Sequence, residues 1–164
     1  MTAPCAQTAL DIHAPLDLVW TVMLDLSRYH EWNPFIIAVE NPPEPVQLGS
    51  GLRLCVRWAN GQLARSGERV THLTPPTSTV DGQCTAHWAY CYTGWLPRAG
   101  LVRATRDQYL RQAHGGLTAY RTQETYFGLL ARWVPVSAVQ DGFERQAQAL
   151  RARAEALAAR ERSR

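Results

Sequence analysis

IHAPLDLVWTVMLDLSRYHEWNPF, residues 12–35, is the most informative stretch of the chain. Pro15 suits the first turn of a helix. Apolar side chains follow at i, i+3, i+4, i+7 and i+8, which predicts a helix lying on a core: Leu16, Val19, Trp20, Met23 and Leu24. A second helical turn runs to Trp32, and Pro34 ends it because proline disfavours helical dihedrals at the preceding residue, Asn33. The segment YHEWNPF is therefore interpreted as a structural corner before a strand at 35–40, with Asn33 satisfying backbone groups, and not as a catalytic cluster.

Alternating strands surround this segment. One precedes it at 5–12, and five follow at 52–58, 63–73, 84–92, 101–111 and 117–127. The turns between the later strands are NGQ, TPPTS with VDGQ, GWLPRAG and QAHGG. This order is typical of an antiparallel meander. Apolar residues then recur at helical spacing over about residues 136–160, and such a long helix has to lie on the concave face of the sheet.

The composition is that of one soluble globular domain spanning residues 1–164. Of its residues 46% are hydrophobic, and no apolar run is long enough to cross a bilayer. The first residues lack the pattern of a secretion signal, so we expect a cytoplasmic protein. The four cysteines show no metal-type spacing and are expected to be small buried side chains. The net charge of +3 comes from arginine alone and is concentrated near the C-terminus, as on a solvated helix face; no nucleic-acid motif accompanies it.

The chain resembles the START-related, polyketide-cyclase-like (SRPBCC, Bet v 1-like) superfamily. Residues 12–35 are similar to its entry pattern, A/S-P-x-x-V-W followed by D-x-x-x-Y-x-x-W-N-P-F, and four later segments also fit: GLRLCV, YCYTGWLP, ETYFGLL and GFERQAQALRARAE. The resemblance covers essentially the whole chain. It implies an α+β helix-grip fold, in which a curved antiparallel sheet of six to seven strands wraps around the C-terminal helix and encloses a cavity.

The resemblance also implies which residues of the last strand face inwards. In the family these are the positions two, four and six before the terminal glycine, here Gly128, which gives Tyr126, Glu124 and Thr122, with Tyr120 next in the series. A register that pairs Tyr109 with Tyr120 adds four residues of the preceding strand: Arg103, Thr105, Asp107 and Tyr109. A slip of one residue would instead turn inwards Val102, Ala104, Arg106, Gln108 and Leu110.

Aromatic and helical residues complete the expected cavity wall. They are Trp88, Tyr90, Tyr92 and Trp95, with Phe143 and Ala147 of the long helix and with Tyr29, Trp32 and Phe35 at the corner. The five histidines are scattered, and each is expected in a turn or at the surface. Gly142 indicates either a close backbone approach or a widened mouth of the cavity.

Three functions remain open. The first is binding of a small, largely apolar molecule with polar groups, such as a lipid, polyketide or isoprenoid. The second is a cyclase, aromatase or dehydratase in which Glu124, Asp107 and Tyr120 move protons; the alternative for these polar residues is a satisfied network that braces the sheet. The third is a protein-interaction module of the co-chaperone or antitoxin kind, using the outer sheet face or the arginine-rich helix end. We expect no metal, no cofactor and no nucleic-acid partner, and a homodimer is left open.

Overall fold

The computed structural model describes residues 3–163, excluding the side chain of His114. In chain order the elements are β1 (Cys5–Ile12), α1 (Leu16–Leu24), the 3₁₀ turn η1 (Leu26–Arg28), α2 (Tyr29–Trp32), β2 (Ile36–Val39), β3 (Gly51–Arg57), β4 (Leu63–Ser78), β5 (Cys84–Tyr92), α3 (Trp95–Arg98), β6 (Arg103–Gln112), η2 (His114–Gly116), β7 (Thr118–Phe127), η3 (Ala131–Trp133) and α4 (Val136–Arg162). Within these residues, no helix combines the length and the apolar character that a membrane span requires.

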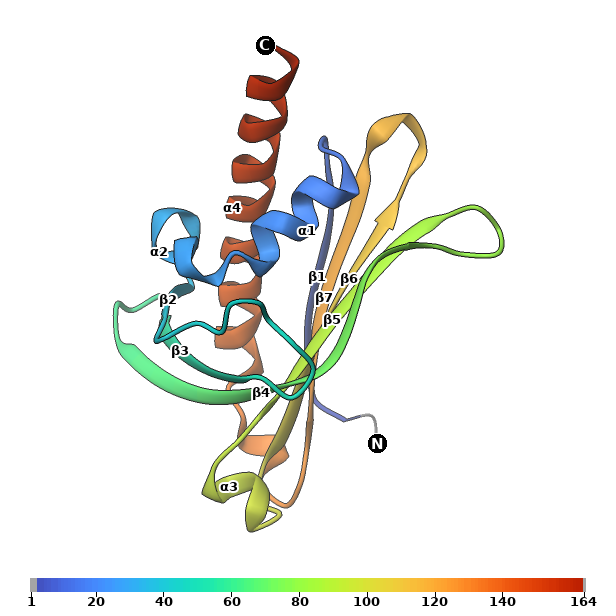
Figure 1. Cartoon of the computed structure of the whole chain (residues 1–164). Coiled ribbons are helices and arrows are strands. Elements are labelled where there is room, and N and C mark those ends of the chain that lie inside the picture. The colour runs from blue at the N-terminus through green and yellow to red at the C-terminus, as the bar shows by residue number, and fades with distance from the viewer. Residues whose placement is uncertain (1–2, 164) are drawn as a thin grey trace.

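The seven strands form one antiparallel sheet in the order β1-β7-β6-β5-β4-β3-β2. The sheet curls around α4, and α1 and α2 cover the open side between its two edges (Figure 1). The helix turns a stripe of apolar side chains towards the sheet, among them Val139, Phe143, Ala147, Leu150 and Ala154. The predicted α+β helix-grip fold is therefore confirmed.

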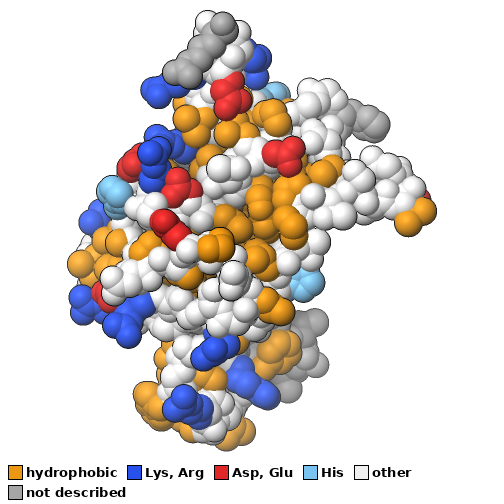
Figure 2. Space-filling model, viewed as in Figure 1, with side chains coloured by type: hydrophobic (Ala, Val, Ile, Leu, Met, Phe, Trp, Pro, Cys, Tyr) orange, Lys and Arg blue, Asp and Glu red, His pale blue; other side chains and the backbone are white. Residues whose placement is uncertain are grey.

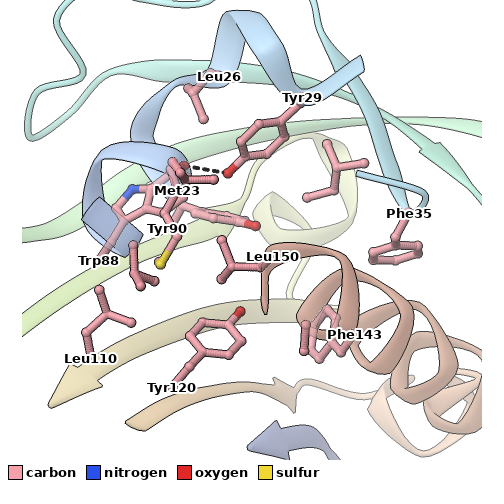
Figure 3. Packing of buried hydrophobic residues seen from close by; sticks show 14 of the residues in the cluster. Met23, Leu26, Tyr29, Phe35, Trp88, Tyr90, Leu110, Tyr120, Phe143 and Leu150 are labelled. Atoms are coloured by element: carbon pink, nitrogen blue, oxygen red, sulfur yellow. Dashed lines mark hydrogen bonds between the residues drawn. The ribbon is translucent and has the colours of Figure 1, made fainter. Parts of the chain in front are cut away.

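The corner at residues 29–35 is built by short-range hydrogen bonds. The Asn33 side-chain oxygen accepts from the backbone N–H groups of Phe35 and Ile36, at 3.0 and 2.9 Å. Tyr29 is buried in the core, and its hydroxyl donates to the Met23 carbonyl at 2.6 Å (Figure 3). Asn33 thus satisfies backbone groups as predicted, while Trp32 is only partly buried and packs edge-on against Tyr29.

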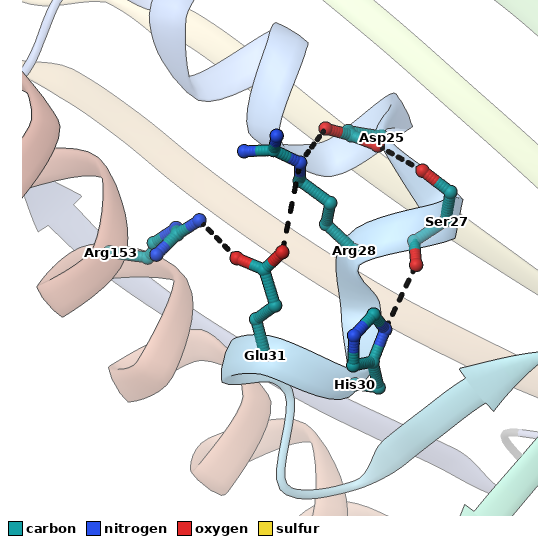
Figure 4. Close-up of polar contacts among 6 residues, drawn as sticks. All are labelled: Asp25, Ser27, Arg28, His30, Glu31 and Arg153. Atoms are coloured by element: carbon teal, nitrogen blue, oxygen red, sulfur yellow. Dashed lines mark hydrogen bonds and ion pairs between the residues drawn. The ribbon is translucent and has the colours of Figure 1, made fainter.

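Ion pairs fasten the outer side of this corner to α4. Arg153 of α4 donates to the Glu31 carboxylate at 2.6 Å, and Arg28 lies between Glu31 and Asp25 (Figure 4). The Nδ1–H group of the exposed His30 donates to the Ser27 carbonyl, 2.9 Å away. It belongs to the surface, as expected for a turn residue.

Two local predictions are wrong. The TPPTS segment is not a turn, because β4 continues through it to Ser78; the strand register shifts between Thr74 and Thr77, and such a bulge tolerates Pro75 and Pro76. The cysteines are not buried either. Cys5 is exposed and the other three are partly exposed, and all four are free thiols.

The register of β6 against β7 also differs from the predicted one. Leu110 pairs with Tyr120, and Arg106 pairs with Glu124. The loop between the strands holds residues 113–117, closed by a 2.7 Å hydrogen bond from the Ala113 N–H to the Leu117 carbonyl, so it is one residue longer than the predicted register allows. The slipped alternative is therefore the one observed, and every side chain of β6 changes face.

Gly142 marks a close approach and not a widened mouth. A Cβ atom at this position would overlap the ring of Phe35, which packs against Phe143 and Trp58. The absence of a side chain at residue 142 lets the corner and α4 meet.

Candidate functional site

A cavity of about 270 Å³ lies between the inner face of the sheet and the N-terminal half of α4. Its apolar wall includes Phe35, Leu54, Val56, Val102, Val139 and Phe143. Its polar wall comes from four adjacent strands and includes Ser66, Glu68, Tyr90, Tyr92, Arg106, Glu124 and Tyr126. The cavity is thus largely apolar with one polar side.

Arg106 is at the centre of the polar wall. On the sheet it is the direct neighbour of Tyr90 on one side and of Glu124 on the other, and its side chain is buried. Its Nε donates to the Thr122 hydroxyl at 3.0 Å, and its Nη1 donates to the Tyr90 hydroxyl and the Gln146 side-chain oxygen, both at 3.1 Å. These bonds fix the guanidinium in one orientation.

One face of the same guanidinium lies over an aromatic ring. Its central carbon is 3.9 Å from the centre of the Phe143 ring, which is a cation–π contact. The remaining nitrogen, Nη2, is buried and has no hydrogen-bond partner among the described residues. Such a donor is costly to bury, so it favours an acceptor brought by a ligand or by water.

Two carboxyl groups share this wall. Burial raises the pKa of Glu68 to about 8, an effect that the hydrogen bond from Ser66 opposes and the nearby Glu124 reinforces. Burial also raises the pKa of Glu124, although Arg106 and the Tyr126 hydroxyl, 2.9 Å away, favour its charged form. At neutral pH Glu68 is therefore mostly a neutral acid that can donate a proton.

Arg106 keeps its positive charge in this setting. Burial opposes the charge, but the neighbouring Tyr90, Tyr120 and Glu124 outweigh it and raise the pKa of the guanidinium. The cavity therefore presents a permanent cation beside two carboxyl groups that hold protons more tightly than usual.

The structure separates the predicted site residues into groups. Tyr90, Tyr92, Glu124, Tyr126, Phe35 and Phe143 line the cavity. Trp88, Tyr120, Thr122 and Ala147 are buried in the core beside it. Trp32 lies in a separate depression between α1 and α4, and Trp95 is exposed on α3.

The expected inward orientation of Arg103, Thr105, Asp107 and Tyr109 is wrong, because the register of β6 turns them to the outer face. There the Nε2 of His87 donates to the Asp107 carboxylate at 2.7 Å, and the ring of His87 stacks between His72 and Tyr109. A depression of about 930 Å³ opens beside this cluster. In its lining His87, Arg121 and Gln123 already have side-chain partners, and the His87 side chain is 23% exposed, so the smaller and more deeply buried inner cavity is the better candidate site.

Sequence reasoning missed Glu68 and Ser66, and it held Arg106 only as an alternative. Strand parity contained the signal: in β4 the residues alternating with Ser66 and Glu68 include Arg65 and Arg69, which mark the solvent face. In β6 the residues on the same side of the strand as Arg106 include Ala104 and Leu110, while the residues on the other side include three charged ones. The more apolar parity of each strand faces inwards.

No group of three or more His, Cys, Asp or Glu side chains is arranged to hold a metal ion in the described part of the chain. The polar groups around the cavity are two guanidinium groups, two carboxyl groups and several hydroxyls. These groups can form hydrogen bonds and transfer protons.

Comparison with known structures agrees with the fold. The two-domain aromatase/cyclase BexL of the BE-7585A biosynthetic pathway is 16% identical, with a TM-score of 0.68 over 92% of this chain, which spans 50% of that protein. The ZhuI aromatase/cyclase from Streptomyces sp. R1128 is 18% identical, with a TM-score of 0.65 over 92% of this chain and 93% of that one. The protein CV1439 from Chromobacterium violaceum is 17% identical, with a TM-score of 0.66 over 93% and 97% of the two chains.

At these identities the structures show the shared fold alone. No match was found among curated proteins. Residues 4–155, however, match the family described as polyketide cyclase / dehydrase and lipid transport, which covers the sheet, the cavity and most of α4. The chain therefore belongs to the polyketide cyclase / dehydrase and lipid transport family.

Proposed function

We propose that this protein binds a small, largely apolar molecule with a carbonyl or hydroxyl oxygen in the inner cavity. The observation that carries the proposal is the buried Arg106, whose Nη2 has no partner among the described residues although the side chain lines the cavity. A ligand oxygen that accepts from this nitrogen would remove an unsatisfied buried donor. The family description, which names cyclases, dehydrases and lipid transport, supports such a ligand.

The cavity volume limits the size of the ligand. An apolar cavity of about 150 Å³ is sufficient for benzene. The 270 Å³ found here would by the same measure hold roughly ten to twelve non-hydrogen atoms, the size of a two-ring molecule. A longer ligand would extend beyond the cavity.

The polar wall determines which end of the ligand points to the sheet. A protonated Glu68 and the Arg106 guanidinium are both hydrogen-bond donors, so they match an oxygen with free lone pairs. The apolar wall opposite them, including Val56, Val139 and Phe143, matches hydrocarbon. We infer an amphipathic ligand whose oxygen faces β4 to β7.

Catalysis in the same cavity is a second candidate, and the pKa of Glu68 favours it. A group with a pKa of about 8 is suited to acid or base work near neutral pH. In an enolisation, the Glu124 carboxylate would take a proton from the carbon next to a carbonyl, while Arg106 would stabilise the negative charge that forms on the oxygen. Glu68 would then supply or remove the proton needed to complete an aldol-type cyclisation or a loss of water.

Binding is tested with a matched pair of probes, 1-tetralone and tetralin, which differ by one carbonyl oxygen. Calorimetric titration should show that 1-tetralone binds at least about fivefold more tightly, because only it has an acceptor for Arg106. Ala104→Leu, which adds bulk to the cavity wall, should weaken binding, while Ala9→Leu in the outer depression should not. Equal loss in both variants, or no binding of either probe, contradicts the proposal.

Catalysis is tested by proton exchange, which needs no knowledge of the natural substrate. In D₂O, the wild type should speed the exchange of the hydrogens next to the 1-tetralone carbonyl, as followed by NMR. Glu124→Gln should abolish this acceleration and keep the fold, since the amide replaces the carboxylate with little change of shape. Binding without any acceleration would leave the carrier function and remove the enzymatic one.

A further inference from the structure

The end of the molecule that carries α3 has an unusual surface. Nine large hydrophobic side chains are exposed in the described residues, and five of them lie at this end, on the β5–β6 and β7–α4 connections or at the end of β7: Trp95, Phe127, Leu129, Leu130 and Trp133. Leu129 is 76% exposed, Trp95 68% and Trp133 61%. We call these five residues the apolar end. Exposed apolar side chains that gather in one patch commonly mark an interaction site.

Backbone hydrogen bonds join the two connections, so the patch is a fixed part of the structure. The backbone N–H of Leu130 donates to the Leu101 carbonyl at 2.8 Å, and that of Leu129 donates to the Gly100 carbonyl at 3.3 Å. Gly128 has a φ of 117° and lies so close to Leu101 that a Cβ atom would come within 2.5 Å of its carbonyl oxygen. The β5–β6 and β7–α4 connections therefore present their side chains together.

The charged residues around the apolar end are all positive. Residues 93–103 and 127–140 contain Arg98, Arg103 and Arg132 and no aspartate or glutamate. All three arginines are exposed, and the guanidinium of Arg132 lies 4.0 Å from the centre of the Trp133 ring. In Figure 2 the lower end of the molecule shows orange and blue side chains with no red ones among them. The matching partner is anionic and has an apolar layer.

We propose that the apolar end docks on the surface of an anionic phospholipid bilayer. Tryptophan prefers the boundary between lipid headgroups and acyl chains, and arginine next to it pairs with anionic headgroups. A bilayer also adapts to a projecting lobe such as the one that holds α3 (Figure 1), whereas an acidic protein would have to supply about 800 Å² of complementary surface. The observations thus favour a membrane over an acidic protein.

The docking would bring the inner cavity close to the lipid. Val102 and Val134 each lie within or next to the two connections, and both line the cavity. A protein bound through the apolar end would hold this side of the cavity near the bilayer, where apolar molecules partition. The docking itself does not depend on which molecule the cavity binds.

The test is flotation of the whole protein with vesicles. The wild type should float with vesicles of phosphatidylcholine mixed with phosphatidylglycerol and much less with pure phosphatidylcholine. Trp95→Ser/Trp133→Ser should lower the partition coefficient by about tenfold or more. Arg98→Gln/Arg132→Gln should lower it by about fivefold for each arginine, and added salt should do the same.

Leu63→Ser/Val80→Ser is the matched control, because both side chains are exposed elsewhere on the surface. It should float like the wild type, and circular dichroism should show that all variants keep the fold. The proposal is overturned if the wild type floats with neither kind of vesicle, or if the control loses as much as the tryptophan variant. It is equally overturned if sedimentation shows a dimer that the tryptophan variant abolishes while neither protein binds vesicles, since the patch would then contact a second copy.

Discussion

The inner and outer faces of the β5–β6 pair carry similar side chains in very different surroundings. Inside, Arg106 lies beside Tyr90 and Glu124 and is 2% exposed. Outside, one residue further along β6, Asp107 bonds to His87, and their side chains are 22% and 23% exposed. Each face thus has an acidic and a basic side chain next to each other, with an aromatic ring beside them.

The difference shows that burial, more than residue type, makes the inner face the candidate site. Burial raises the pKa of both inner carboxyl groups and leaves one guanidinium nitrogen without a partner among the described residues. On the outer face water can reach the groups, and the carboxylate already has its hydrogen bond. A ligand on the inner face can therefore supply a hydrogen-bond acceptor that is missing there, whereas the outer carboxylate already has its partner.

The largest effect is expected from Arg106→Met. It removes the donor for Thr122, Tyr90 and Gln146 and the positive charge near two buried carboxyl groups. Urea denaturation should show a loss of about 3 to 4 kcal/mol in the free energy of unfolding. The control is Arg111→Met on the outer face of the same strand, which should change stability by less than about 0.5 kcal/mol. Equal losses of stability in the two variants would mean that water reaches the inner face of β6 as easily as the outer face.

The next effect concerns pH and Glu68. Its pKa of about 8 in the folded protein lies above the ordinary value of 4.5, so between these values the folded state binds the proton more tightly than the unfolded state. This contribution to stability is complete below about pH 4.5 and is lost as the pH rises through about 8. Between about pH 6 and pH 9, the wild type should lose about 3 kcal/mol more than Glu68→Gln.

Urea titrations at several pH values measure this difference. Glu161→Gln, which removes an exposed carboxylate from the end of α4, should follow the wild type at every pH. If Glu68→Gln shows the same pH dependence as the wild type, then Glu68 titrates normally and the inner wall is not desolvated.

Most of the fold could be predicted from the sequence because its signals are local. The apolar stripe of α1, the corner at Asn33 and the alternation in five strands each depend on a few neighbouring residues. The polar wall could not be predicted in the same way. It depends on the β6–β7 register, which one additional residue in the 113–117 loop changes.

That loop contains two successive glycines in the left-handed conformation, Gly115 and Gly116, with φ values of 75° and 78°. Such a pair permits loops of more than one length, so the sequence alone leaves the register open. The consequence is large because neighbouring residues of β6 differ in charge: one register puts Arg106 inside, and the other puts Asp107 there. Counting the apolar residues on each side of β6 would have favoured the observed register.

A smaller effect is expected from Gly142→Ala, which tests how closely α4 approaches the corner. The new methyl group would overlap the Phe35 ring, although alanine is the better helix former. The net loss of stability should be about 1 to 2 kcal/mol, and 1-tetralone should bind more weakly because the displaced ring lines the cavity.

A double-mutant cycle sharpens this prediction. Phe35→Leu makes room for the methyl group, so the loss caused by Gly142→Ala should shrink in its presence. Strict additivity of the two changes would show that the helix and the corner are not in contact at this point.

The smallest effect is expected on the outer face, from Asp107→Asn. The amide can still accept a hydrogen bond from His87, and the site is partly exposed, so the loss should stay below about 1 kcal/mol in urea denaturation. The affinity for 1-tetralone and the exchange of its hydrogens should be unchanged, because Asp107 points away from the cavity. If this substitution instead impaired binding as strongly as a change in the cavity wall, the outer depression would be the functional site and the contrast between the two faces would be reversed.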